Sequence, residues 1–248
     1  MAADLPRRLL AEFVDTAFLL AIVIGSGIMA TRLTSDVGLQ LLVNALATGA
    51  GLVALILALG PVSGAHFNPA VTLADTWFAS SRPRGTRWPE AGWYCLAQVL
   101  GACVGVMVAN LMFGLSAINV SDHTRTGADL WLGEVVATVG LLLVIFGVVR
   151  SGRATAAPFA VGGYIAAAYF FTSSTSFANP AVTLARTLSN TFAGIAPASA
   201  PAFIAAQLVG MVLAVGLVAL LYPGIEAVAD DVLLHHDPTS REGVSRHG

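Results

Sequence analysis

The sequence predicts an all-α membrane protein in which six transmembrane helices and two re-entrant half-helices form two inverted repeats. Three observations lead to this fold class. The chain of 248 residues is 56% hydrophobic and only 10% charged, with a mean hydropathy of +0.80, whereas soluble domains carry about 25% charged residues. Apolar runs of about 18 residues or more recur along the chain, as membrane spans require. In addition, one short motif occurs once in each half of the sequence.

The repeated motif predicts the two half-helices. Its first copy covers residues 68–76 (NPAVTLADT) and its second covers residues 179–187 (NPAVTLART), so the copies differ only at Asp75 and Arg186. Asn is a good helix N-cap, and Pro is tolerated at the first helical position. Each copy therefore predicts a loop that turns into a short helix, over about 69–79 and about 180–188. Two such closely similar copies indicate a duplicated, two-fold architecture.

Six apolar segments predict helices that cross the membrane. They cover residues 9–29, 38–59, 92–113, 130–149, 156–171 and 201–221. We interpret residues 1–248 as a single membrane domain with repeat halves at about 9–113 and 130–222 and a polar tail over 223–248. The first span is too long and too acidic near its start for a removable signal peptide.

The distribution of arginine predicts the orientation in the membrane. With the N-terminus in the cytoplasm, nine arginines are inside and three are outside, as the positive-inside rule requires, and both termini are cytoplasmic. The inside group is Arg7, Arg8, Arg82, Arg84, Arg87, Arg150, Arg153, Arg241 and Arg246, and the outside group is Arg32, Arg125 and Arg186. Because each half contains three spans, the halves must be inverted relative to each other. Non-helical backbone at membrane depth is tolerated only inside protein or along a water-filled path, so the two loops predict a pore.

At this point the chain resembles the aquaporin, or major intrinsic protein, family. The resemblance rests on SGAHFNPAVT at residues 63–72, on the second NPA at residues 179–181, and on the glutamates of Ala11-Glu12-Phe13 and Gly133-Glu134. It covers about residues 9–221. The resemblance implies an aquaporin-like fold and a passive channel for small uncharged solutes, with no cofactor and no metal. It also implies a homotetramer with one pore per subunit in the cell (inner) membrane.

The predicted roles of the pore residues follow from the two motifs. The pore centre is formed by Asn68, Pro69, Ala70, Asn179, Pro180 and Ala181. We expect both asparagines to donate hydrogen bonds to a solute, and the positive ends of the half-helix dipoles to oppose cations. Glu12 and Glu134 are expected to accept hydrogen bonds from the loop backbones, which is a structural role. The resemblance places His66 and Phe67 in the pore lining on the cytoplasmic side, although a lone His could equally be a packed, hydrogen-bonded residue.

The chain departs from the family at the outer constriction. Family members usually place Arg directly after the second NPA, and here that residue is Val182. Family spacing gives Thr48, Ala167 and Ser176 as the other three members of the selectivity filter. This ring is uncharged and lacks large side chains, so we expect a wide outer filter. A similar loss of the Arg occurs in a bacterial branch of the family that is associated with arsenic resistance.

The sequence does not fix the roles of two charged residues near the predicted pore. Arg186 lies four residues after Val182 and should share its helix face, roughly 6 Å further outward. It could line a solvated outer vestibule, or it could reach the surface and pair with Asp122 or Asp129. Asp15 lies one turn after Glu12 and is expected to be solvated in the cytoplasmic vestibule.

The favoured function is a passive channel for water, glycerol-like polyols and metalloid acids such as arsenite or methylated arsenicals. The alternatives are an ion-coupled secondary transporter, which also uses inverted repeats, a mainly water-selective aquaporin, and a non-conducting packing protein. An enzyme is not expected, because no nucleophile–base constellation or metal-ligand cluster is found. The expected partners are small neutral solutes, the lipid bilayer and further copies of the chain. No basic stripe suggests nucleic acid.

Overall fold

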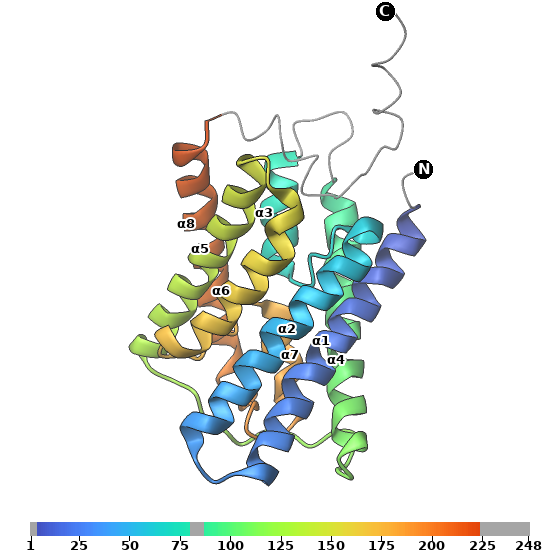
Figure 1. Ribbon diagram of the computed structural model, residues 1–248, viewed down its shortest axis with the longest axis vertical. Coiled ribbons are helices and arrows are strands. Elements are labelled where there is room, and N and C mark those ends of the chain that lie inside the picture. Colours follow the sequence, from blue (N-terminus) through green and yellow to red (C-terminus); the bar gives the residue numbers. More distant parts are fainter. Residues whose placement is uncertain (1–3, 80–86, 224–248) are drawn as a thin grey trace, which may run out of the picture.

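The computed structural model describes residues 4–79 and 87–223, and in these ranges every regular element is a helix. Six long helices run side by side, and two short helices enter the bundle from opposite ends (Figure 1). The long helices are α1 (Leu5–Leu33), α2 (Val37–Ser63), α4 (Trp88–Met112), α5 (Ala128–Arg150), α6 (Ala157–Phe171, after a 3₁₀ turn at Ala154–Ala156) and α8 (Ala200–Leu221). The predicted fold class is confirmed.

The short helices are α3 and α7. Helix α3 (Pro69–Ala79) has the predicted bounds, whereas α7 ends early, at Pro180–Ala185, and continues as a 3₁₀ turn over Arg186–Leu188. The first lies between α2 and α4 in the chain, and the second lies between α6 and α8. The bundle thus contains two sets of three spans, each with one half-helix.

Helix α1 begins four residues before its predicted start because a polar cap extends it. The Asp4 side chain accepts a hydrogen bond from the Arg7 N–H, and a proline occupies the first turn, where its missing N–H is harmless. Asp36 caps α2 in the same way, by accepting from the Leu39 N–H at 2.8 Å. The polar ends of these helices therefore extend beyond the apolar segments that the sequence revealed.

The backbones of the two halves contact each other where α2 crosses α6. A Cβ atom added to Gly49 would lie 2.8 Å from the Gly162 carbonyl oxygen, and one added to Gly162 would lie 2.5 Å from the Gly49 carbonyl oxygen. Only glycine fits at both positions, so the backbones touch here, as small residues allow between membrane helices. The contact is reciprocal, as a two-fold relation between the halves requires.

The chain enters and leaves the bundle at one end. Helix α1 begins and α8 ends at the end that we call proximal, and the opposite end is called distal (Figure 1). The connections 34–36 and 113–127 lie at the distal end. Several predicted inside arginines, namely Arg82, Arg84, Arg241 and Arg246, lie outside the described residues, as does the tail from residue 224.

Candidate functional site

The loop before each half-helix has an unusual backbone. Ala65 and Phe67 have φ values of +53° and +53°, and Ser176 and Ala178 have φ values of +51° and +48°. In both loops these residues lie three and one positions before the motif asparagine. Left-handed conformations of residues other than glycine cost about 1–2 kcal/mol each. The surrounding structure must therefore hold both loops in place.

Two buried glutamates hold these loops. The Glu12 carboxylate accepts hydrogen bonds from the backbone N–H groups of His66 and Phe67, both at 3.0 Å. The Glu134 carboxylate accepts from the N–H groups of Phe177 and Ala178, both at 2.8 Å. Both glutamates are completely buried. The carboxylates satisfy backbone donors that would otherwise be unpaired in the membrane interior.

Two glutamines, which the sequence interpretation missed, complete these networks. The Gln98 amide donates to the first carboxylate at 2.7 Å and to the Thr72 hydroxyl at 2.9 Å. The Gln207 amide donates to the second carboxylate at 2.6 Å and to the Thr183 hydroxyl at 2.8 Å. Each network therefore links a span, a loop, a half-helix and a second span.

The motif asparagines join the two half-helices. The Asn68 side-chain amide donates to the Ala178 carbonyl at 2.7 Å, and the Asn179 amide donates to the Phe67 carbonyl at 2.8 Å. Each amide oxygen also caps its own helix by accepting from the N–H two residues later, at 2.9 and 3.0 Å. Each amide nitrogen carries two hydrogens, so the second N–H of each asparagine is available to a solute in the cavity that both residues line.

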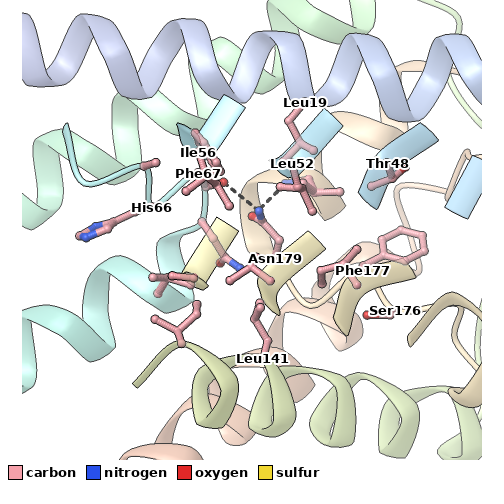
Figure 2. Close-up of a pocket in the computed structure, with 18 of the residues that line it drawn as sticks. Leu19, Thr48, Leu52, Ile56, His66, Phe67, Leu141, Ser176, Phe177 and Asn179 are labelled. Atoms are coloured by element: carbon pink, nitrogen blue, oxygen red, sulfur yellow. Dashed lines mark hydrogen bonds between the residues drawn. The ribbon is translucent and has the colours of Figure 1, made fainter. Parts of the chain in front are cut away.

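A cavity runs along the half-helices and is lined from both halves of the chain (Figure 2). His66 lies toward one end, Thr48 and Ser176 lie toward the other, and Asn179 lies between them. Most of the wall is apolar, and its members include Leu19, Val23, Leu52, Ile56, Leu141, Ile145, Val161 and Ile165. Polar groups are thus confined to the centre and the two ends.

His66 lies at the proximal end of this cavity. Its side chain is buried, its Nδ1 is 3.1 Å from the Thr72 hydroxyl, and its Nε2 is 3.9 Å from a carboxylate oxygen of Asp75. The residue therefore both lines the cavity and is packed and hydrogen-bonded, so both interpretations of the lone His apply. Phe67 lines the same stretch.

At the distal end the structure corrects one predicted filter residue. Thr48, Ser176 and Val182 line the cavity, but Ala167 is exposed on the outer face of α6. Tyr169 takes its place, and its hydroxyl lies 3.1 Å from that of Thr48. Helix residues two apart point to nearly opposite sides, so a spacing that is wrong by two residues turns a lining position outward.

Arg186 lines the cavity, as the first expectation required, but it is buried rather than solvated. Its side chain is only 2% exposed, its Nε donates to the Ala193 carbonyl, and its guanidinium carbon lies 3.5 Å from the Phe177 ring centroid. Because the side chain is buried, it neither lies in a solvated vestibule nor reaches the surface. Within residues 4–79 and 87–223 it forms no ion pair with Asp122 or Asp129. The reason is that α7 tightens into a 3₁₀ turn at this residue and the following loop offers a carbonyl acceptor.

Asp15 is likewise not in a vestibule. It is completely buried, and its two carboxylate oxygens have no hydrogen-bond partner among the described residues. It does not line the cavity. The helix turn that carries Glu12 and Asp15 faces the packed interior between spans rather than water.

Six spans, two half-helices that meet end to end and a cavity between them define a membrane channel. The chain belongs to the major intrinsic protein family, whose model matches residues 2–178 and, in an overlapping second match, residues 154–245. It is 52% identical over 214 residues to the aquaglyceroporin AqpS of Rhizobium meliloti, covering 86% of this chain and 89% of that protein. It is 32% identical over 173 residues to the aquaporin AqpM of Methanothermobacter marburgensis, covering 61% and 68% of the two chains.

The fold also matches a known structure. The X-ray structure of the aquaglyceroporin from Plasmodium falciparum superimposes with a TM-score of 0.66, covering 92% of this chain and 99% of that chain at 20% sequence identity. At this identity the match concerns the fold alone. Together with the family assignment, it identifies the chain as a multi-pass membrane channel and not an enzyme.

Proposed function

We propose that the protein is a passive channel through which water, glycerol-like polyols and other small uncharged solutes cross the membrane. The observation that carries this proposal is the pair Asn68 and Asn179, which line one cavity and retain a free amide N–H each. The relatives named aquaglyceroporin and aquaporin support it. A solute that leaves bulk water would exchange its hydration for these donors at the pore centre.

The rest of the wall supports selection against ions. The cavity between the central asparagines and its ends is mostly apolar, so it offers no replacement for an ion's hydration shell. Both half-helices begin at the centre, where their positive dipole ends oppose cations. A neutral polyol can instead keep its carbon side against the apolar wall while its hydroxyls use the central donors.

We extend the solute range to metalloid acids such as arsenous acid and its methylated forms. These are small, neutral near pH 7 and rich in oxygen, like polyols. Val182 supports this extension, because it is smaller than the Arg that the family usually places there. A mainly water-selective channel is the alternative, and the bulk of Tyr169 and Arg186 at the distal end is the observation that favours it. Comparing the permeability to water, glycerol and arsenous acid separates the two.

For the topology, we propose that the proximal end faces the cytoplasm of a cell with an inner membrane. Among the described cations, Arg7, Arg8, Arg87, Arg150 and Arg153 belong to the proximal connections, and Arg32, Arg125 and Arg186 belong to the distal end. We also propose one channel domain over residues 1–248 and a homotetramer. Exposed apolar side chains on the long helices, such as Leu100, Leu132 and Leu213, are compatible with lipid and subunit contacts. Native mass spectrometry from detergent tests the number of subunits.

Liposomes that contain the purified protein test the function. We expect glycerol to equilibrate faster than in protein-free liposomes, at a rate that neither a proton gradient nor a sodium gradient changes. An ion-coupled transporter would instead accumulate solute when a gradient is imposed. Solute accumulation above the outside concentration would therefore replace the channel proposal with a transporter.

A further inference from the structure

The distal end of the cavity contains a buried guanidinium that is only partly used. The Arg186 Nε donates to the Ala193 carbonyl, and the guanidinium carbon lies over the Phe177 ring, 3.5 Å from its centroid. Its two terminal amino groups donate to none of the described residues. The side chain lines the cavity and is only 2% exposed, so a solute in the cavity is the partner that these donors can reach.

A second guanidinium shares the same aromatic ring. The Arg125 guanidinium carbon lies 5.4 Å from the Phe177 centroid, and its nitrogens donate to the Gly194 and Phe192 carbonyls at 3.0 and 3.3 Å. The ring itself packs edge-on against Phe203 at 5.1 Å. Among the described residues, no carboxylate lies within ion-pair distance of either arginine. The distal end therefore carries positive charge that no ion pair neutralises.

The backbone that positions Arg186 is fixed from outside. The connection between α4 and α5 pairs with the 3₁₀ turn, because the Asn119 and Ser121 N–H groups donate to the Leu188 and Thr187 carbonyls at 3.0 and 2.9 Å. The Asn110 amide also donates to the Leu188 carbonyl, at 3.1 Å. A guanidinium held on a braced loop and stacked on a ring is pre-organised, so little side-chain entropy is lost when it binds a solute.

Hydroxyl groups line the same end of the cavity (Figure 2). The Thr48 and Tyr169 hydroxyls lie 3.1 Å apart, so one donates to the other and the pair keeps further hydrogen-bonding capacity. The Ser176 hydroxyl is buried and has no partner among the described residues. A buried polar group without a partner is costly, and a solute oxygen at this point would satisfy it.

We propose that Arg186 is the specificity-determining residue of the distal constriction, where it excludes cations and binds the oxygen atoms of a solute together with the Tyr169 and Ser176 hydroxyls. This inference rests on the proposed channel function. The chemistry fits a small neutral solute with several oxygens, a polyol or an undissociated oxyacid. The guanidinium donates, the hydroxyls donate and accept, and Val182 leaves room for the carbon or central atom. Arg186 thus supplies the charge that is missing at position 182.

The test uses the full-length protein in liposomes and compares Arg186→Gln and Arg186→Lys with the wild type. Three rates are measured: osmotic water flow, glycerol uptake and proton leak, the last with an internal pH dye. The matched control is Arg32→Gln, because Arg32 is an exposed distal arginine that also stacks on a ring, Phe113, at 4.9 Å. A thermal melt of each variant reports folding.

We expect Arg186→Gln to raise the proton leak roughly tenfold or more, as the loss of one buried charge at close range implies. We also expect the ratio of glycerol permeability to water permeability to change by roughly tenfold, because the loss of one hydrogen bond to a charged group has about this effect on a rate. Arg186→Lys keeps the charge but loses the planar fork, so the proton leak stays low while the ratio still changes. The control matches the wild type in all three rates.

Two results would overturn the assignment, and a third would overturn the proposed function instead. An Arg186→Gln channel with wild-type proton leak and wild-type glycerol-to-water ratio would show that Arg186 sets neither property. An equal loss of all rates together with a lower melting temperature would show that the residue is structural. If wild-type liposomes conduct water and glycerol no faster than protein-free ones, the channel proposal itself fails.

Discussion

Asn68 and Asn179 exchange hydrogen bonds across the centre of the molecule, and each donates to the carbonyl that precedes the other. The first asparagine reaches the Ala178 carbonyl and the second reaches the Phe67 carbonyl, at 2.7 and 2.8 Å. The residues that would bind a solute are thus also the residues that hold the two half-helices together. The sequence predicted that both asparagines face one point, but not that they cross-link the loops.

Replacing Asn68 or Asn179 by Asp should therefore lower both flux and stability. A carboxylate cannot donate, and it would face the carbonyl oxygen that now accepts, so we expect a loss of about 1–3 kcal/mol in stability and reduced glycerol uptake. The control is Asn44→Asp. The Asn44 amide also donates to a buried carbonyl, that of Val23, at 2.9 Å, but the residue does not line the cavity. Reduced stability with normal flux per folded channel in all three variants would contradict the central role.

The two glutamates make a second prediction. Glu134→Gln places an amide N–H₂ among the donors that now point at the carboxylate, so we expect the melting temperature to fall by an amount equivalent to about 2–5 kcal/mol. Glu12→Gln should behave in the same way, since its contacts mirror those of Glu134. The control is Glu90→Gln, because Glu90 is half-buried and pairs with Arg8 at 3.5 Å, where an ion pair contributes less than about 1 kcal/mol. Equal effects at all three sites would mean that the glutamates do not hold the loops.

A third prediction tests whether Tyr169 or Ala167 limits the size of the solute at the distal end. Tyr169→Ala removes a ring from the distal cavity and should admit polyols larger than glycerol, whereas Ala167→Leu changes the exposed face of α6 and should leave the size limit unchanged. Uptake of glycerol, erythritol and sorbitol into liposomes measures the limit. If Ala167→Leu changes the size limit more than Tyr169→Ala does, Ala167 is the filter residue, as the family spacing predicted.

Val182→Arg tests the width of the distal constriction in the opposite direction, by adding a large side chain. A second guanidinium in the constriction narrows it, so we expect the uptake of glycerol and of larger solutes to fall more than the water flow. In the double variant with Arg186→Gln the charge is moved rather than added, and proton exclusion should be retained. If all solutes lose permeability equally, residue 182 does not set the size limit.

Asp15 gives a prediction about stability. Its carboxylate oxygens are buried without a partner and Glu12 lies one helical turn away. Burying this acid costs free energy whether it stays ionised or takes up a proton on folding. An isosteric neutral amide avoids that cost, so Asp15→Asn should raise the free energy of unfolding by about 1–3 kcal/mol. Asp36→Asn is the control, because Asn is an equally good N-cap for α2. An unchanged or lower melting temperature for Asp15→Asn would mean that the acid has a partner in the native protein.

The sequence predicted the helices well because apolar runs and Asn-Pro starts act locally. Helix α3 has the predicted bounds. The spans other than α6 are longer than predicted, and α1 shows one cause, because the Asp4 cap extends it beyond its apolar segment. The glutamine networks had a signal that was not used. The segment Ala97-Gln98-Val99-Leu100-Gly101 of the third span corresponds to Ala206-Gln207-Leu208-Val209-Gly210 of the sixth, and a lone Gln at matching places in both halves indicates a shared role.

The distal end could not be predicted in the same way, because its geometry depends on loops. Tyr169 replaces Ala167 because the spacing across residues 172–178 cannot be fixed from the motif alone. Arg186 is drawn inward because α7 changes to a 3₁₀ turn and the Ala193 carbonyl comes within reach. The Tyr169–Thr48 contact is remote in sequence and the Arg186 contact crosses an irregular loop, so no periodicity marks either.

The most direct test of the central claim is glycerol uptake into liposomes that contain the wild-type protein, measured by light scattering with and without an imposed ion gradient. We expect uptake that is faster than in protein-free liposomes, is insensitive to the gradient and ends at equal concentrations on both sides. We expect it to be strongly reduced in Asn179→Asp. Uptake at the rate of protein-free liposomes, or accumulation driven by the gradient, would contradict a passive channel through the paired asparagines.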